Sequence, residues 1–202
     1  MPGSLITVAL PLTAIYVVFL VWYGGRGKPL TQEEIAGYLA QLRAGARGEP
    51  GAIRLEDVER LVQRDDGREF VMHNLIRYRE KALYPPGHDY GDSARAADRR
   101  YGKAIIPDLL RCGAVPVFVA RRSGSLVEPE GADRWDLVAM VRYRSRRDFL
   151  RFALAVERKG ITVHKWAAIE KTQIFPVTPL LSLIFVRGAV GAVLAAIGLL
   201  LA

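Results

Sequence analysis

The charged residues of this chain are confined to its middle, and both ends are apolar. No charged side chain precedes Arg26, and Arg187 is the only one after Lys171. All 21 acidic residues lie between these positions, so the 50% hydrophobic composition averages two apolar ends and a polar middle. A chain of 202 residues is long enough for one soluble domain with additions. The distribution predicts a polar domain held between two membrane segments.

The first apolar end has the length of a transmembrane helix. Residues 5–23 form an uncharged run of 19 residues, and a bilayer core requires about 20 helical residues. A secretory signal peptide is the alternative, but no Lys or Arg precedes the run and no small-x-small cleavage site follows it. We therefore expect a retained transmembrane helix over residues 1–23, with Pro11 tolerated inside it.

The second apolar end, residues 179–202, is interrupted by Arg187. A charge at the centre of a membrane helix costs about 2.5–3.5 kcal/mol, although a long side chain can extend towards the near interface. Either the whole run spans, or the part before Arg187 lies at the interface and residues 188–202 enter shallowly. We expect a C-terminal membrane helix over residues 178–202. The expected membrane or partner contacts are Trp22, Tyr23, Arg187, Gly188 and Gly191, because aromatic rings suit the interface and small residues allow close helix packing.

The flanking charges predict an orientation. Arg26 and Lys28 follow the first apolar run, Lys165 and Lys171 precede the second, and the outer ends carry no basic side chain. Basic residues favour the cytoplasmic side of a membrane. We therefore expect two spans of the inner membrane, a cytoplasmic middle, and both termini on the opposite side.

The net charge of +8 is densest between residues 142 and 151. An ordinary solvated face is one interpretation, and contact with anionic lipid head groups or a membrane partner is another. Nucleic acid also attracts basic patches, but no nucleic-acid fold motif accompanies these residues. We expect lipid and protein partners and no nucleic acid. The run consists of Arg142, Arg144, Arg146, Arg147 and Arg151.

Residues 24–68 read as a juxtamembrane segment with two helices. The glycines at residues 24–27 suggest a hinge at the membrane exit. Thr31 followed by Glu34 forms a capping box, in which each side chain bonds the other residue's backbone at a helix start. Apolar residues continue at helical spacing and recur over residues 55–62. This helical pair is expected to pack on the domain or on a partner.

The strongest strand signal is residues 70–78, which begin a domain over residues 69–177. Both faces of this strand are largely apolar, which is typical of a strand covered on both sides. A helix over residues 93–112 follows, with Pro107 expected to kink or restart it and Cys112 expected in the core. Strands are predicted over residues 115–121, 135–143 and 171–177. A helix capped by Ser145 and a short turn over residues 164–169 separate the last two.

The resulting α+β order, strand–helix–strand–strand–helix–strand, resembles the dimeric α/β-barrel superfamily of ferredoxin-like domains. It is most similar to a widespread, uncharacterised bacterial family of small proteins with that fold. The resemblance implies a four-stranded antiparallel sheet, flanked here by N- and C-terminal transmembrane helices. It is carried by residues 73–78, by Tyr101 with residues 107–113, by residues 135–145 running into Phe149, and by residues 164–170.

The resemblance also implies a partner and a ligand. Domains of this superfamily pair their sheets face to face around a cavity, which implies a homodimer through the sheet face. Some members degrade haem with Asn, Trp and His, residue types found here at Asn74, Trp135 and His164, although His164 does not lie on the expected helix. The candidate ligand-binding residues are Asn74, Tyr78, Trp135, Tyr143 and His164.

The residues themselves give no catalytic constellation. Three isolated His and one Cys form no metal-ligand cluster. No Gly-rich phosphate loop follows a strand, and no Ser lies in a Gly-x-Ser-x-Gly elbow. His73 alternates away from Asn74 along the strand, so the two cannot share one wall of a pocket. We expect no metal, no cofactor and no catalytic residues.

Two functions remain. The first is an accessory or scaffold subunit whose cytoplasmic domain packs on a larger membrane complex, of respiratory or photosynthetic type, rather than an enzyme. The second is a membrane-tethered binder or oxygenase acting on an apolar ligand such as haem or quinone. The second requires an open cavity lined by Asn74, Tyr78, Trp135 or Tyr143.

Overall fold

The computed structural model describes residues 2–25, 27–45, 54–88, 90–178 and 186–201. The chain divides into two compact units, one made of Met1–Gly24 with Pro179–Ala202 and the other of Gly25–Thr178. The described residues form seven helices and four strands. Arg26 and residues 179–185, which entered the predictions of orientation and of the second span, lie outside the described residues.

The first unit consists of two apolar helices, α1 (Pro2–Tyr23) and α7 (Val186–Leu201). At 1.5 Å per residue, α1 is about 33 Å long and α7 about 24 Å. Among the described residues only α1 is long and apolar enough to cross a membrane, judged by length and composition. Of the second transmembrane helix expected over residues 178–202, the structure describes α7, which is shorter than a spanning helix.

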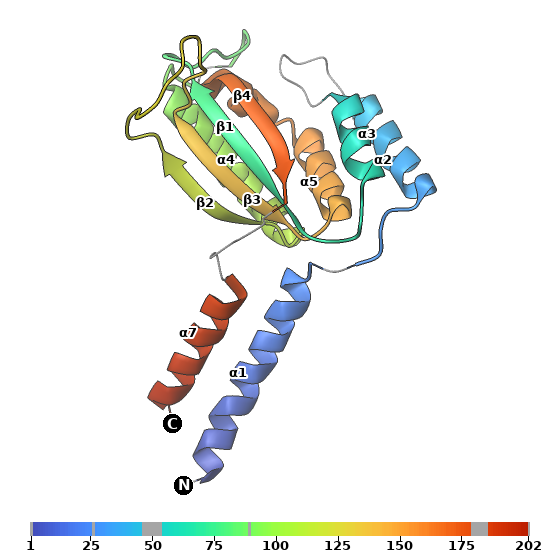
Figure 1. Cartoon of the computed structure of the whole chain (residues 1–202), viewed down its shortest axis with the longest axis vertical. Coiled ribbons are helices and arrows are strands. Elements are labelled where there is room, and N and C mark those ends of the chain that lie inside the picture. Colours follow the sequence, from blue (N-terminus) through green and yellow to red (C-terminus); the bar gives the residue numbers. More distant parts are fainter. Residues whose placement is uncertain (1, 26, 46–53, 89, 179–185, 202) are drawn as a thin grey trace. The chain divides into compact units, whose positions relative to one another are not determined.

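The centre of the second unit is a four-stranded antiparallel sheet (Figure 1). Its strands are β1 (Phe70–Tyr78), β2 (Val115–Arg121), β3 (Leu137–Tyr143) and β4 (Ile169–Val177), in the order β2-β3-β1-β4. The apolar strand singled out in the sequence is therefore central, between β3 and β4. The edges of the sheet are β2 and β4.

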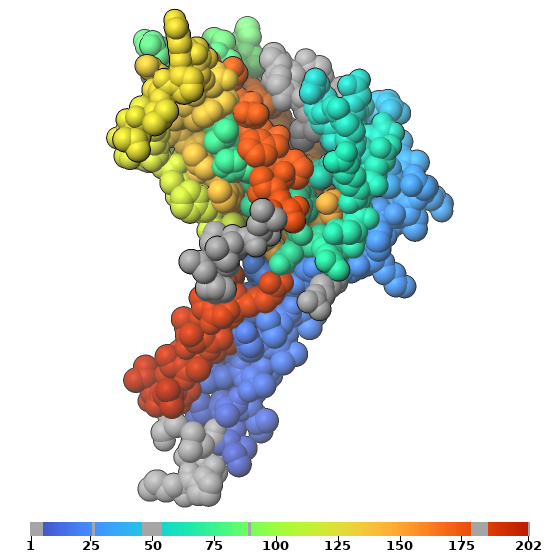
Figure 2. Space-filling model, in the orientation of Figure 1, coloured from blue at the N-terminus to red at the C-terminus, as the bar shows by residue number. Residues whose placement is uncertain are grey.

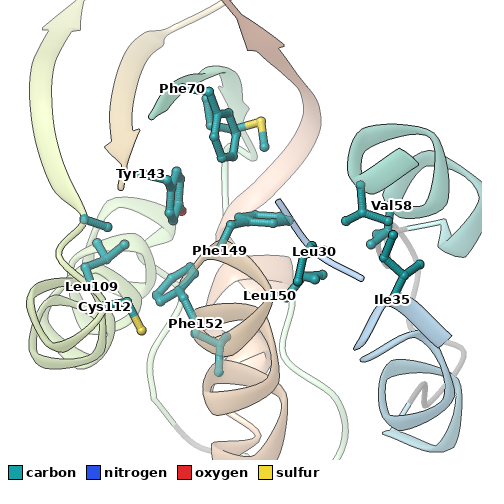
Figure 3. Packing of buried hydrophobic residues seen from close by; sticks show 14 residues of the cluster. Leu30, Ile35, Val58, Phe70, Leu109, Cys112, Tyr143, Phe149, Leu150 and Phe152 are labelled. Atoms are coloured by element: carbon teal, nitrogen blue, oxygen red, sulfur yellow. The ribbon is translucent and has the colours of Figure 1, made fainter. Parts of the chain in front are cut away.

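Helices cover one face of this sheet (Figure 1). The face is packed by α4 (Ala94–Arg111), α5 (Arg146–Lys159) and α6 (Thr162–Ala168). Phe70 and Tyr143 stack with ring centroids 5.5 Å apart, and Phe149 of α5 meets Tyr143 edge-on at 5.2 Å. Figure 3 shows these aromatic side chains between the sheet and α5, with Leu109 of α4 beside them. Burial of this cluster is the main stabilisation of the unit.

The two juxtamembrane helices belong to the same unit. They are α2 (Gln32–Gly45) and α3 (Leu55–Gln63), and they place Ile35, Val58 and Val62 in the buried core. The predicted capping box is present, because Thr31 N–H donates to Glu34 Oε2 at 2.9 Å and Glu34 N–H donates to Thr31 Oγ1 at 3.2 Å.

Several local predictions differ from the structure. β3 begins at Leu137 rather than at residue 135, and β4 begins at Ile169 rather than at residue 171. The expected turn before β4 is the helix α6, whose Ala167 and Ala168 are buried with Ala97 of α4. α4 continues through Pro107 rather than restarting there, because buried residues on both sides of the proline outweigh one lost backbone hydrogen bond.

Candidate functional site: the open face of the sheet

No described element of the second unit covers the other face of the sheet, which we call the open face. Strand register places Phe118, Met140, His73 and Phe175 directly opposite one another on β2, β3, β1 and β4. Opposed residues in antiparallel strands project from the same face, so these four side chains form one row across the sheet. Figure 2 shows the surface of this unit with β1 and β4 side by side.

Neighbouring rows of the open face are mixed. Leu75 of β1 lies between Val138 of β3 and Gln173 of β4, and Val71 of β1 lies between Arg142 of β3 and Val177 of β4. Phe118 at the edge is 45% exposed. An apolar face of this kind on a folded domain is characteristic of a binding surface.

Basic side chains border the open face, and each has an acidic partner within the chain. Arg77 Nε donates to Glu170 Oε2 at 3.0 Å, and Lys171 Nζ donates to Asp133 at 2.6 Å. Arg142 is buried and donates to Glu69, a contact between side chains far apart in the sequence. The border of the face is therefore close to charge-balanced.

His73 is the polar member of the central row. Its ring meets the ring of Phe175 edge-on, with centroids 4.9 Å apart. Its imidazole makes no hydrogen bond to any described residue, and the side chain is half-buried. The sequence indicated that His73 lies on the opposite face from Asn74. The row it belongs to could be identified only from the pairing of four strands.

The five residues predicted to bind a ligand do not converge. Asn74 donates from Nδ2 to the carbonyls of Met72 at 3.0 Å and Ala139 at 3.2 Å, which is a local role within the strands. Tyr143 lies in the aromatic core and is 5% exposed. Trp135 precedes β3 and is half-buried.

Tyr78 lies beside a shallow polar hollow rather than an apolar cavity. Its hydroxyl donates to Asp98 Oδ2 at 2.7 Å, and burial followed by this contact raises the pKa of the phenol. The hollow, of about 380 Å³, is lined by Arg79, Glu80, Arg95 and Asp136 among others, and by none of the other four predicted residues.

His164 belongs to a cluster that the sequence did not reveal. On α6, its Nδ1 lies 2.9 Å from the hydroxyl of Tyr84, and its ring meets that of Tyr90 at 4.8 Å. Burial, then the charges of Arg100 and His88, lowers the pKa of His164. The aromatic residues between positions 84 and 90 were the only sign of this cluster in the sequence. Their contact with α6 depends on the tertiary structure, so the sequence could not predict it.

The basic run of residues 142–151 is engaged within the chain. Arg147 donates to Glu34 of α2 at 2.8 Å, and Arg146 donates to Asp66 at 2.7 Å, so both tie the juxtamembrane helices to α5. Arg144 and Arg151 both contact the buried carboxylate of Asp148. Contact of these arginines with lipid head groups remains a prediction. Their acidic partners neutralise part of the charge that would attract the lipid.

In the first unit, α1 and α7 pack as an antiparallel pair. A Cβ on Gly191 would lie 3.2 Å from the hydroxyl of Tyr16, and one on Gly198 would lie 3.1 Å from Leu12. The contact of Gly191 agrees with the expected packing role of this small residue, whereas Gly188 is exposed. Small residues therefore bring the two backbones close together.

Arg187 lies at the start of α7, level with the end of α1. Its Nη2 donates to the carbonyl of Gly24 at 2.7 Å, and its guanidinium lies 4.6 Å from the ring centroid of Tyr23. Trp22 neighbours Tyr23, with ring centroids 6.3 Å apart. The aromatic residues predicted at the membrane interface and the arginine that interrupts the second apolar run are thus neighbours.

No group of three or more His, Cys, Asp or Glu within the described ranges is arranged to hold a metal ion. Cys112 is buried in the core, and burial raises the pKa of its thiol. A thiol in this state is a poor nucleophile. The open face is therefore the surface of the second unit with the clearest binding character.

Comparison with known proteins defines the fold class. The chain is an α+β protein with a four-stranded antiparallel sheet. A solved structure with this arrangement is RPA0582 of Rhodopseudomonas palustris, a protein of unknown function, with 24% identity and a TM-score of 0.53. The match covers 78% of this chain and 99% of that one, and the methylated form of RPA0582 matches equally well over 97% of its chain. No protein-family model and no curated protein matches the sequence.

Proposed function

We propose that this chain is an accessory or scaffold subunit of a membrane protein assembly, anchored by its helix pair and binding through its open face. The second unit is, in this proposal, a ferredoxin-like domain of the dimeric α/β-barrel type. The strand order β2-β3-β1-β4 and the placement of α4, α5 and α6 on one face support that description.

The observation that carries the proposal is the apolar row of Phe118, Met140, His73 and Phe175 on the open face. Burying apolar surface contributes about 25 cal/mol per Å², so this face stabilises association strongly once it is covered. Its occupant in this proposal is the open face of a second copy. The paired charges at the border support this choice, because two identical basic borders would otherwise repel each other.

The helix pair supports a membrane location. α1 has the length and composition of a spanning helix. α7 is shorter, but it packs along α1 through Gly191 and Gly198, and its single charge meets the end of α1. We propose that both helices insert into the inner membrane with the second unit on the cytoplasmic side. Arg187 then lies at the interface, where the cost of its charge is small.

The alternative of an apolar-ligand binder or oxygenase receives less support. It depends on Asn74, Tyr78, Trp135 and Tyr143 facing a common cavity. Asn74 is satisfied by strand carbonyls and Tyr143 is enclosed in the core, whereas Tyr78 meets a polar hollow. A role for the domain in assembly requires none of these residues to be accessible.

The test is purification from native membranes in mild detergent, followed by mass spectrometry and light scattering. We expect two copies of this chain together with subunits of one larger assembly. A monomer free of other subunits would contradict the whole proposal. Other subunits with a single copy of this chain would contradict only the pairing of open faces.

Phe118→Glu tests the surface directly. Phe118 is exposed at the edge of the open face, so a carboxylate there should spare folding but place two charges in the interface and turn the pair into monomers. Leu126→Glu is the control, because Leu126 is fully exposed in the loop between β2 and β3. Equal dissociation by both variants, or by neither, would show that the open face is not the contact.

A further inference from the structure

His73 occupies an unusual position for a titratable group. It lies in the central apolar row between Met140 and Phe175, with Val71 and Leu75 on either side along β1. Its imidazole has no hydrogen-bond partner among the described residues. In the separate chain, the open side of the ring can be hydrated. A covering surface would remove that water without replacing its hydrogen bonds.

The charged groups nearest the histidine on this face are all basic. They are Arg77 on the same strand, Arg142 on β3 and Lys171 on β4, whereas the nearest β2 residue, Phe118, is uncharged. The acidic partners of these residues, Glu170, Glu69 and Asp133, neutralise them at the border. A second copy in face-to-face contact brings the same set again. No acidic side chain of the described face is therefore placed to stabilise a charged imidazole.

We propose that His73 makes the pairing of open faces sensitive to pH, so that two copies associate when the imidazole is neutral and separate when it is protonated. This inference rests on the proposed pairing of open faces. Enclosing a charged imidazole without a hydrogen-bond partner is costly, whereas enclosing a neutral one costs less.

The direction and size of the effect follow from linkage. A free histidine side chain titrates near pH 6.5, and the pair binds protons less readily than the separate chains. Association is therefore strongest where the imidazole is neutral, and it weakens as the pH falls and the separate chains take up protons. Each pair contains two copies of His73, so the association constant falls by up to about 100-fold per pH unit.

The experiment measures the dissociation constant of the full-length protein in detergent from pH 8.0 to 5.5, by sedimentation in the presence of a chelator. For the native chain we expect the dissociation constant to rise about 100-fold between pH 8.0 and pH 5.5. His73→Leu should pair at least as tightly at pH 8.0 and should lose the pH dependence. His88→Leu, which removes an exposed histidine outside the face, should behave like the native chain.

The possible failures can be told apart. If the native chain does not pair at pH 8.0, the proposed function fails with respect to the open face. If it pairs with the same affinity at every pH, or if His73→Leu keeps the full pH dependence, pairing stands and the role of His73 is wrong.

Discussion

At the scale of single residues, Lys165 is a partly exposed cation that lies against aromatic rings. Its ammonium group lies 4.6 Å from the ring centroid of Trp166 and 6.0 Å from that of Tyr101, and it makes no ion pair with a described residue. Burial lowers the pKa of Lys165 to about 8, although the charge of Asp98 acts in the opposite direction. The ring contacts offset only part of the cost of partly enclosing this charge.

We expect Lys165→Met to stabilise the fold at pH 7. The pKa of Lys165 is about 8 in the folded chain and about 10.4 when unfolded, so below pH 8 the fold bears the full cost of the charge. Methionine removes that cost, and because the Lys165 side chain is partly exposed to solvent, we expect a gain of about 1 kcal/mol. The gain should shrink between pH 8 and about 10.4, as the native lysine releases its proton first in the folded state.

Thermal unfolding in detergent at pH 7 and at pH 10 measures this difference. Lys81→Met is the matched control, because the Lys81 side chain is 80% exposed and its removal should change stability by less than about 0.5 kcal/mol. A Lys165→Met variant that is less stable than the native chain at pH 7 would mean that the ring contacts outweigh burial.

At the scale of elements, the juxtamembrane segment is fixed by contacts that sequence spacing does not reveal. Leu30 N–H donates to Asp65 Oδ2 at 2.7 Å, and Gly27 N–H donates to the carbonyl of Gly67 at 2.8 Å. The chain before α2 thus pairs with the turn after α3. The sequence predicts a hinge at the glycines of residues 24–27. In the structure, Gly27 is instead fixed by its hydrogen bond to Gly67 within the second unit.

Gly67→Ala should disrupt this contact. The φ angle of Gly67 is +71°, and an added Cβ would overlap the carbonyl oxygen of Gly27 and lie 2.8 Å from its carbonyl carbon. The left-handed conformation alone costs a non-glycine residue about 1–2 kcal/mol. We expect a total loss above about 3 kcal/mol, because two backbone segments must also separate.

The control for this substitution has the same backbone strain without the close contact. Gly87 has a φ angle of +88°, and nothing lies within 4 Å of an added Cβ. Gly87→Ala should therefore lose only about 1–2 kcal/mol in thermal unfolding. Equal losses at the two positions would show that the contact between Gly27 and Gly67 adds nothing to stability.

At the scale of the whole molecule, the decisive property is the topology of the two ends. If both helices span the membrane, alkaline phosphatase fused after Ala202 should be active in a bacterial host, because the enzyme requires the periplasm. The same enzyme fused after Thr178 should be inactive. The positive charges beside the apolar runs and the contact between Arg187 and Gly24 are the basis of this expectation.

The fusion after Ala202 also distinguishes the two possible arrangements of the second apolar end, which either spans the membrane or enters it shallowly. α7 is about 24 Å long, less than a bilayer core of about 30 Å, and a short helix spans only if the bilayer thins locally. An inactive enzyme after Ala202, with green fluorescent protein bright at the same position, would mean that residues 188–202 enter the membrane without crossing it.

The sequence by itself determined the features that depend on neighbouring residues. The distribution of charge separated the apolar ends from the middle, Thr31 and Glu34 marked the start of α2, and alternation along residues 70–78 placed His73 and Asn74 on opposite faces. Capping, periodicity and solvation are local effects, so spacing alone reports them.

Only the tertiary structure decided which surfaces are covered. Alternation could not tell which face of β1 the helices occupy, so Tyr143 was assigned to a cavity although α5 encloses it in the core. Arg146 and Arg147 seemed available to lipid because Asp66 and Glu34 are about 80 and 113 positions away in the chain. The row through Phe118, Met140, His73 and Phe175 depends on the register of four strands, which long-range packing sets.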